Sequence, residues 1–125
     1  MPKIFIADDD REMRSMLGAS LRREGFDVQL IDSGVQLLAE LDAARAVGQA
    51  PDLVITDLRM PGIDGLEVLR HVQTTSPSLP VILITAFGDR RTHERAHSLG
   101  AAFVIDKPFQ LGVLRDQVEA LIRSR

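Results

Sequence analysis

Two short runs in the chain contain only apolar residues, and they restrict the fold more than any other feature. They are Leu53-Val54-Ile55 and Val81-Ile82-Leu83-Ile84. A strand with one wet face alternates apolar and polar residues, whereas a strand covered on both faces does not. Continuous apolar strands are typical of parallel sheets that carry helices on both sides. The two runs therefore predict an α/β fold built on a buried parallel sheet.

Strand-like and helix-like segments alternate along the whole chain. Apolar residues recur every four positions at Met13, Leu17 and Leu21, as on one face of a helix, and Gly25 is a stop signal. The predicted strands are Lys3–Ala7, Asp27–Ile31, residues 53–56, Val81–Thr85 and residues 102–106. The predicted helices run over residues 11–24, from 34, from 65, over 89–99 and from 111. This alternation predicts a five-stranded, doubly wound parallel sheet of the (βα)5 type.

The composition fits a single globular domain. The chain has 125 residues, with 15 basic and 18 acidic side chains and a net charge of −3. Nucleic-acid binding usually needs a basic surplus, so it is not expected here. The absence of cysteine excludes a disulfide scaffold, a thiolate metal site and a cysteine nucleophile. Because no apolar run approaches the roughly 18 residues of a membrane span and no signal peptide is evident, the expected location is the cytoplasm.

Acidic residues follow two of the predicted strands directly. Residues 8–10 are all aspartate, and Asp57 ends the third strand. Since the working groups of open α/β sheets gather at the carboxyl ends of the strands, we expect these carboxylates to lie together, with Thr85 and Lys107 beside them. Crowded carboxylates repel one another unless a cation joins them, and Mg²⁺ prefers oxygen ligands. The sequence therefore predicts a Mg²⁺ site.

A lysine and a threonine hydroxyl near Mg²⁺ are typical of phosphoryl chemistry. The chain has neither a P-loop nor a Gly-x-Gly-x-x-Gly motif, so no nucleotide cradle is expected. A carboxylate could then accept the phosphoryl group itself, as in proteins that form aspartyl phosphates. Asp57 is the best candidate because it ends the central strand and opens a loop.

Four motifs in sequence order make the chain resemble the receiver domain of bacterial two-component response regulators. They are residues 7–10 (Ala-Asp-Asp-Asp), 54–65 (Val-Ile-Thr-Asp-Leu-Arg-Met-Pro-Gly-Ile-Asp-Gly), 79–86 (Leu-Pro-Val-Ile-Leu-Ile-Thr-Ala) and 106–109 (Asp-Lys-Pro-Phe). Each motif is weak alone, but the four together are highly specific and cover essentially the whole chain. The resemblance implies a flavodoxin-like strand order 2-1-3-4-5 and one receiver domain over residues 1–125, either stand-alone or the N-terminal piece of a longer regulator.

The resemblance also implies a role for each matching acid. Asp57 would accept a phosphoryl group from a sensor histidine kinase or a phosphotransfer protein. Asp9, Asp57 and the backbone carbonyl of Arg59 would ligate Mg²⁺, and Asp8 would act mostly through a metal-bound water.

Three further residues complete the implied site. Thr85 would donate a hydrogen bond to the phosphoryl group, and Ala86, the next residue, would belong to the same binding site. Lys107 would pair first with Asp57 and then with a phosphoryl oxygen. The bond from Lys107 to Pro108 would be cis, and Gly65 would let the loop enter the third helix.

The implied function is a signalling switch. Phosphorylation would shift a pre-existing equilibrium in the face formed by the fourth helix, fifth strand and fifth helix, which would engage an output domain or effector protein. Such a domain catalyses only its own phosphorylation and dephosphorylation. Direct contact with nucleic acid or membrane is not expected, and a phosphorylation-dependent homodimer, the cognate kinase and the regulated process stay open.

Two positions depart from the family or modify its site. The family usually has Tyr or Phe three residues before the lysine, where this chain has Val104. Phe103 is adjacent, but neighbouring strand residues face opposite sides, so it cannot substitute and we expect altered signalling from Thr85. Phe87 would shield the phosphoryl group from water.

Two other functions are weighed against the switch. An aspartate-nucleophile phosphatase usually has a second acid two residues after the nucleophile, but Arg59 stands there. A phosphorylation-independent interaction module on the same fold is the other, and the retention of Asp9, Asp57, Thr85 and Lys107 argues against it.

Some charged residues fit a solvated surface as well as a function. The fourth helix has a thin apolar stripe of Thr92, Ala96 and Leu99, which predicts weak docking and suits a switch element. The histidines are expected to be ordinary surface residues: His71, His93 and His97. The first-helix arginines either face an acidic kinase or serve solubility: Arg11, Arg14, Arg22 and Arg23.

Overall fold

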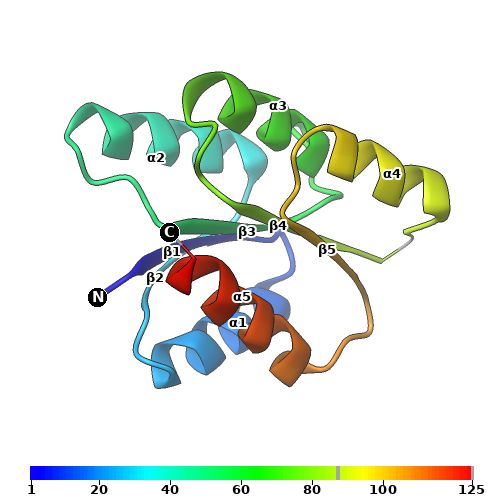
Figure 1. The fold of residues 1–125 in the computed structure, drawn as a ribbon, viewed down its shortest axis with the longest axis horizontal. Helices are drawn as coiled ribbons and strands as arrows, with labels where there is room; N and C mark the ends of the chain where they lie inside the picture. The colour runs from blue at the N-terminus through cyan, green and yellow to red at the C-terminus, as the bar shows by residue number, and fades with distance from the viewer. Residues whose placement is uncertain (87, 125) are drawn as a thin grey trace.

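Figure 1 shows the fold of the chain in a computed structural model, which describes residues 1–86 and 88–124. Strands and helices alternate along these residues, as the sequence predicts. The strands are β1 Lys3–Ala7, β2 Asp27–Ile31, β3 Leu53–Asp57, β4 Val81–Thr85 and β5 Phe103–Asp106. The helices are α1 Arg11–Arg23, α2 Gly34–Ala46, α3 Gly65–Thr75, α4 Arg90–Ser98 and α5 Leu111–Arg123.

All five strands belong to one parallel sheet with the order β2-β1-β3-β4-β5. β3 lies at the centre, and every residue of β3 and β4 is buried. The continuous apolar runs are therefore covered on both faces, which confirms the predicted doubly wound sheet. The strand order implied by the family resemblance is confirmed as well.

Helices cover both faces of the sheet (Figure 1), with α2, α3 and α4 on one side and α1 and α5 on the other. Alternate strand residues serve the two sides. Val54 of β3 belongs to the apolar cluster under α2, α3 and α4, whereas its neighbours Leu53 and Ile55 belong to the cluster under α1 and α5. The fold thus has two apolar cores separated by the sheet. The carboxyl ends of the strands lie between the two helix layers, where α/β sheets usually have their functional groups.

Most helices begin at a residue whose side chain accepts a backbone N–H of the first turn, which replaces a missing intrahelical partner. Among the described residues, such caps occur at Asp10, Ser33, Asp64 and Asp89. Gly25 and Gly100 follow α1 and α4 with φ angles of 95° and 97°, a left-handed conformation that favours glycine. The helix starts predicted at residues 11, 34, 65 and 111 are confirmed, and so is the predicted stop at Gly25.

A few element boundaries differ from the prediction by one residue. β3 extends through Asp57, because Asp57 pairs with Ile84 and the Leu58 N–H donates to the Ile84 carbonyl at 2.8 Å. β5 begins at Phe103 rather than at residue 102. The helices α1 and α4 each end one residue earlier than predicted. Asp57 is therefore a strand residue, fixed by the sheet rather than by the following loop.

α4 is the most polar of the helices. Ala96 is its buried residue, and Thr92 and the following Leu99 are half-buried. This arrangement matches the thin apolar stripe seen in the sequence. In the described part of the chain, no helix combines the length and apolar character needed to cross a membrane.

Candidate functional site

Three aspartates from two neighbouring strands lie together at the carboxyl edge of the sheet. One carboxylate oxygen each of Asp8, Asp9 and Asp57 lies within 4.8 Å of the others. β1 and β3 pair in register up to Ala7 and Thr56, so the next residues emerge side by side. Asp8 and Asp57 are buried, with 1% and 7% of their surface exposed, and Asp9 is exposed. The predicted convergence of these acids is confirmed.

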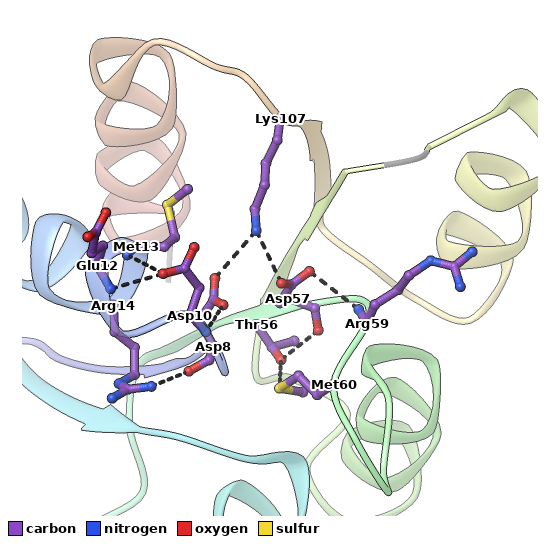
Figure 2. A network of polar contacts seen from close by, with 10 residues as sticks. All are labelled: Asp8, Asp10, Glu12, Met13, Arg14, Thr56, Asp57, Arg59, Met60 and Lys107. Atoms are coloured by element: carbon purple, nitrogen blue, oxygen red, sulfur yellow. Dashed lines mark hydrogen bonds and ion pairs between the residues drawn. The ribbon is translucent and has the colours of Figure 1, made fainter.

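Asp8 is held in place through its backbone and its side chain. Its N–H donates to the Ile31 carbonyl at 3.2 Å, and its Oδ1 accepts the Asp10 N–H at 2.9 Å. Arg14 Nη1 donates to the Asp8 carbonyl at 2.7 Å (Figure 2). Asp10 caps α1, which also carries Arg14. The first turn of α1 therefore fixes the position of the Asp8 carboxylate.

Lys107 reaches into the acidic cluster from the segment that follows β5. Its Nζ lies 3.2 Å from Asp57 Oδ2 and 3.8 Å from Asp8 Oδ2, so the amine stands between the two carboxylates (Figure 2). The Lys107 N–H donates to the Thr85 carbonyl at 2.8 Å, and the bond to Pro108 is cis, as expected. Strand pairing with β4 thus continues up to the residue that bears the amine.

The pKa values of Asp8 and Lys107 reflect burial and mutual charge. Burial is the largest influence on Asp8 and raises its pKa from 3.8 to about 6; the Asp10 N–H lowers the pKa, and the Asp57 charge raises it. Burial lowers the pKa of Lys107, but the charges of Asp57 and Asp8 outweigh it, so this pKa is raised. Lys107 is therefore a fixed cation at neutral pH, and Asp8 is a carboxylate that a further cation would stabilise.

One buried oxygen in the cluster lacks a hydrogen-bond donor among the described residues. This atom is Asp8 Oδ2, whose ion-pair partner Lys107 stands 3.8 Å away. Leaving such an atom unsatisfied costs on the order of 1–3 kcal/mol. Three carboxylates with a shared open side supply hard oxygen ligands, which suit Mg²⁺ better than a soft metal. The residues present fit the predicted Mg²⁺ ion.

Comparison with known proteins decides the family. The family model for the response regulator receiver domain matches residues 4–119. The chain belongs to this family. The family resemblance that the four sequence motifs indicate is therefore confirmed.

Two curated relatives are longer proteins. The C4-dicarboxylate transport transcriptional regulatory protein DctD of Rhizobium meliloti (strain 1021) is 40% identical over 108 residues, which are 86% of this receiver domain and 22% of that protein. Response regulator MprA of Mycobacterium avium (strain 104) is 35% identical over 121 residues, which are 97% of this chain and 51% of that protein. The chain thus spans about a fifth to a half of these relatives.

A solved structure confirms the fold. The CheY-like response regulator receiver domain protein from Methanospirillum hungatei JF-1 superimposes with a TM-score of 0.90 at 21% identity, covering 99% of this chain and 95% of that one. At this level of identity, the similarity is one of fold.

Thr85 ends β4, the strand that pairs with β3, and Ala86 follows it. Thr85 is fully buried and stands one residue beyond Ile84, which pairs with Asp57. Ala86 follows it directly and is exposed. Their contacts with a phosphoryl group stay predictions. Phe87 lies outside the described residues, so its shielding role also stays a prediction.

Arg59 contributes its backbone to the site and sends its side chain elsewhere. The Arg59 N–H donates to Asp57 Oδ1 at 3.3 Å, whereas its guanidinium extends away from Asp57 toward α4 (Figure 2). Arg59 and Asp9 line one recess of about 380 Å³ beside the acidic cluster. This placement agrees with a backbone role for Arg59, although its carbonyl as a metal ligand stays a prediction.

Gly65 permits a close approach of α3 to the end of β3. A Cβ at this position would lie 2.8 Å from the Asp57 carbonyl and 2.9 Å from Leu58 Cα, both backbone atoms. The Gly65 N–H donates to the Leu58 carbonyl at 2.8 Å. The predicted role of Gly65 in the entry to the third helix is therefore confirmed, and its physical cause is the close approach to the backbone of Asp57 and Leu58.

Two arginines of α1 form hydrogen bonds within the domain that were not expected from the sequence. Arg14 donates to the Asp8 carbonyl, and Arg22 Nη2 donates to the Val28 carbonyl at 2.9 Å. The signal for Arg14 was present, because helical side chains lean toward the N-terminus of their helix and Arg14 lies one turn into α1. Arg14 is therefore a support of the site that sequence reasoning missed.

The expectation of ordinary surface histidines is wrong for two of the three. His71 Nε2 lies 2.9 Å from Asp42 Oδ1, and His93 Nε2 lies 2.9 Å from Asp106 Oδ1. Their side chains are only 27% and 30% exposed, whereas His97 is exposed as expected. Both pairs join different elements, so no local spacing in the sequence could reveal them.

Phe103 and Val104 face opposite sides of the sheet, which confirms the strand prediction. Val104 is buried in the core under α2, α3 and α4, and Phe103 packs against the core under α1 and α5. Phe103 therefore cannot occupy the place of the family's usual aromatic residue. The side of β5 that faces α4 carries the small Val104 instead.

Proposed function

We propose that Asp57 accepts a phosphoryl group and that this receiver domain is the phosphorylation-driven switch of a two-component system. The observation that carries the proposal is the ion pair of 3.2 Å between Lys107 Nζ and Asp57 Oδ2, at the end of the central strand and beside an acidic cluster. Phosphoryl transfer needs little covalent chemistry from the protein but depends on positioned charge. A buried carboxylate with a fixed cation beside it meets that need.

The proposed step transfers phosphorus from nitrogen to oxygen. A carboxylate oxygen of Asp57 attacks the phosphorus of a phosphohistidine, and the new O–P bond forms as the P–N bond breaks. The electron pair of the broken bond stays on the imidazole nitrogen, which takes a proton from water. Later attack of water on phosphorus returns the Asp57 carboxylate and releases inorganic phosphate. The domain thus catalyses only its own phosphorylation and dephosphorylation.

Three residues around Asp57 would stabilise the product. Lys107 would exchange its contact with the Asp57 carboxylate for one with a phosphoryl oxygen, with little movement of the amine. The Thr85 hydroxyl would donate to another phosphoryl oxygen, and the adjacent Ala86 would complete the binding site. Thr85 ends β4, the strand next to β3, and Ala86 follows it, whereas Lys107 follows β5, the strand beyond β4.

Asp9, Asp57 and the Arg59 carbonyl would hold Mg²⁺ directly, and Asp8 would act through a bound water. The ion would supply positive charge for the phosphoryl oxygens. The buried Asp8 Oδ2 without a donor and the pKa of Asp8, raised mainly by burial, support this assignment, because a nearby cation would stabilise such a carboxylate.

The partners follow from the same chemistry. The phosphoryl donor would be a sensor histidine kinase or a phosphotransfer protein, and the face of α4, β5 and α5 would engage an output domain or effector. Two relatives are named as a transcriptional regulatory protein and a response regulator, which supports an output of that kind for this chain. A cytoplasmic location and a phosphorylation-dependent homodimer belong to the same proposal.

The test is incubation with Mg²⁺ and acetyl phosphate, followed by intact-protein mass spectrometry. We expect one phosphoryl adduct on the wild-type chain, none on Asp57→Asn and none when the Mg²⁺ is chelated. Asp10→Asn is the matched control, because it removes a neighbouring charge while keeping an oxygen that can cap α1, and it should still be phosphorylated. An adduct that persists in Asp57→Asn would contradict the proposal.

A further inference from the structure

A hydrogen-bonded pair joins α4 to the end of β5, next to the proposed phosphorylation site. His93 Nε2 lies 2.9 Å from Asp106 Oδ1, across 13 residues of sequence. Both side chains are partly exposed, at 30% and 51%. Within the described part of the chain, no other side chain of α4 forms a hydrogen bond or ion pair with a different element. The pair is thus the polar link that fixes this helix to the sheet.

Gly88 packs the segment before α4 against this pair. A Cβ at Gly88 would collide with Asp106 Oδ1 and would lie 2.8 Å from His93 Nε2 and 2.6 Å from Thr85 Cγ2. The absence of a side chain at Gly88 lets the Thr85 methyl group, the Asp106 carboxylate and the His93 ring crowd around one backbone atom. If Gly88 moves, its close contacts with the His93–Asp106 pair must therefore change as well.

The pair also reaches the two residues proposed to contact the phosphoryl group. Asp106 is the strand partner of Thr85, and the next residue, Lys107, donates its N–H to the Thr85 carbonyl at 2.8 Å. Movement of Thr85 toward Asp57 would thus pull on the same strand end that holds Asp106. The link between β5 and α4 passes through His93.

Among the described residues, few apolar contacts hold α4 in place. Ala96 is its buried residue, and the core beneath it receives Val104 from β5 rather than a large ring. A helix with so few apolar contacts has a low local stability, so a single hydrogen bond contributes a large share of what fixes its position.

We propose that the His93–Asp106 hydrogen bond is a tie that holds α4 against β5 and opposes the movement of Thr85 toward a phosphoryl group on Asp57. The proposal rests on the proposed function of Asp57. The family usually has Tyr or Phe at the position of Val104. In this chain the tie takes over part of the coupling between Thr85 and the surface that we expect such a residue to provide. Phosphorylation breaks or lengthens the tie, and α4 then moves relative to β5.

Linkage gives the proposal its measurable consequence. An interaction that favours the arrangement without a phosphoryl group lowers the affinity for that group, and its removal raises the affinity by the same factor. One hydrogen bond of ordinary strength corresponds to a change of about three- to tenfold. Beryllofluoride, which binds carboxylates as a phosphoryl mimic in the presence of Mg²⁺, is the probe.

The experiment measures beryllofluoride affinity at a fixed Mg²⁺ concentration for the wild-type chain and three variants. His93→Ala should bind about three- to tenfold more tightly than wild type. His93→Gln, whose amide reaches the place of Nε2, should return toward the wild-type value. His97→Ala removes an exposed histidine from the same helix and should leave the affinity unchanged. An unchanged or weakened affinity in His93→Ala overturns the proposal.

Two further measurements keep the proposal testable in every case. If His93→Ala does not fold, Asp106→Asn weakens the same bond without leaving a cavity, and unchanged affinity in that variant overturns the tie. If the wild-type chain does not bind beryllofluoride, the proposed function of Asp57 fails. Hydrogen exchange of the α4 amides then tests the tie alone: faster exchange in His93→Ala than in His97→Ala supports it, and equal exchange overturns it.

Discussion

The carboxyl edge around β1 and β3 differs sharply from the neighbouring side formed by α4 and β5. At the first, Asp8 and Asp57 are buried and are positioned by strand pairing, by the Asp10 cap and by Arg14. At the second, among the residues that the structure describes, a polar helix whose buried residue is Ala96 is joined to the sheet by one side-chain pair. One region holds its carboxylates through several contacts, and the other is joined to the sheet through few, which fits the displacement proposed for α4.

This difference matches the needs of a switch. The chemistry requires side chains held in place before the phosphoryl group arrives, because preorganised charge is what stabilises the transferred group. The signal requires an element with two arrangements of similar free energy, which is drawn from the least stable part of a fold. In the proposed switch, the sheet would supply the first requirement and α4 the second.

The sharpest way to break this comparison is to truncate one apolar residue in each region. Ile55→Ala in β3 should lower the free energy of unfolding by about 2–5 kcal/mol, because its side chain is fully buried in a packed core. Leu99→Ala beside α4 should lower it by less than about 1 kcal/mol, because Leu99 is only half-buried. Urea unfolding measures both, and equal losses would contradict a difference in local stability.

The substitution Asp8→Asn tests the region around β1 and β3, because it removes one buried negative charge from the acidic cluster. The pKa of Asp8 is about 6 in the fold and 3.8 ordinarily, so the folded chain binds this proton more tightly than the unfolded chain. The stabilisation that the protonated Asp8 side chain gives the fold is therefore present below about pH 4 and is lost as the pH rises to about 6. Asp8→Asn should remove this slope and stabilise the metal-free protein at pH 7 by on the order of 2 kcal/mol.

Unfolding in a chelator at pH 4.5 and pH 7 measures this effect. Addition of Mg²⁺ should raise the stability of the wild-type protein and have a smaller effect on Asp8→Asn. If Asp8→Asn is no more stable than wild type at pH 7, burial of the ionised Asp8 carboxylate does not lower the stability of the fold.

A smaller effect is expected from the support beneath Asp8. Arg14→Ala removes a charged donor from the Asp8 carbonyl and should lower the free energy of unfolding by about 1 kcal/mol, with a several-fold loss of Mg²⁺ affinity. Arg11→Ala, on an exposed residue of the same turn, is the control and should change neither quantity appreciably. If the two variants behave alike, α1 does not position the acidic cluster.

Much of the fold was predictable because its signals are local. Continuous apolar runs marked β3 and β4, and the spacing of Met13, Leu17 and Leu21 with Gly25 after them marked α1. The assembly of Asp8, Asp9, Asp57 and Lys107 could be expected as well, since parallel strands bring their carboxyl ends to one edge.

The remaining features depend on contacts between elements distant in sequence. The pairing of His93 with Asp106 requires the docking angle of α4 on β5, which no periodicity encodes. The end of β3 at Asp57 was placed one residue short because the last strand residue is polar and its pairing with Ile84 is set by β4. Such features arise from tertiary structure, and they decide how the chemistry would be linked to the surface.

The most direct test of the central claim is a crystal structure of the chain with Mg²⁺ and beryllofluoride. We predict beryllofluoride attached to an Asp57 oxygen, with Lys107 Nζ and the Thr85 hydroxyl on its fluorines and a Mg²⁺ ion held by Asp9 and Asp57. Beryllofluoride bound elsewhere, or a cation outside the cluster of Asp8, Asp9 and Asp57, would contradict the account.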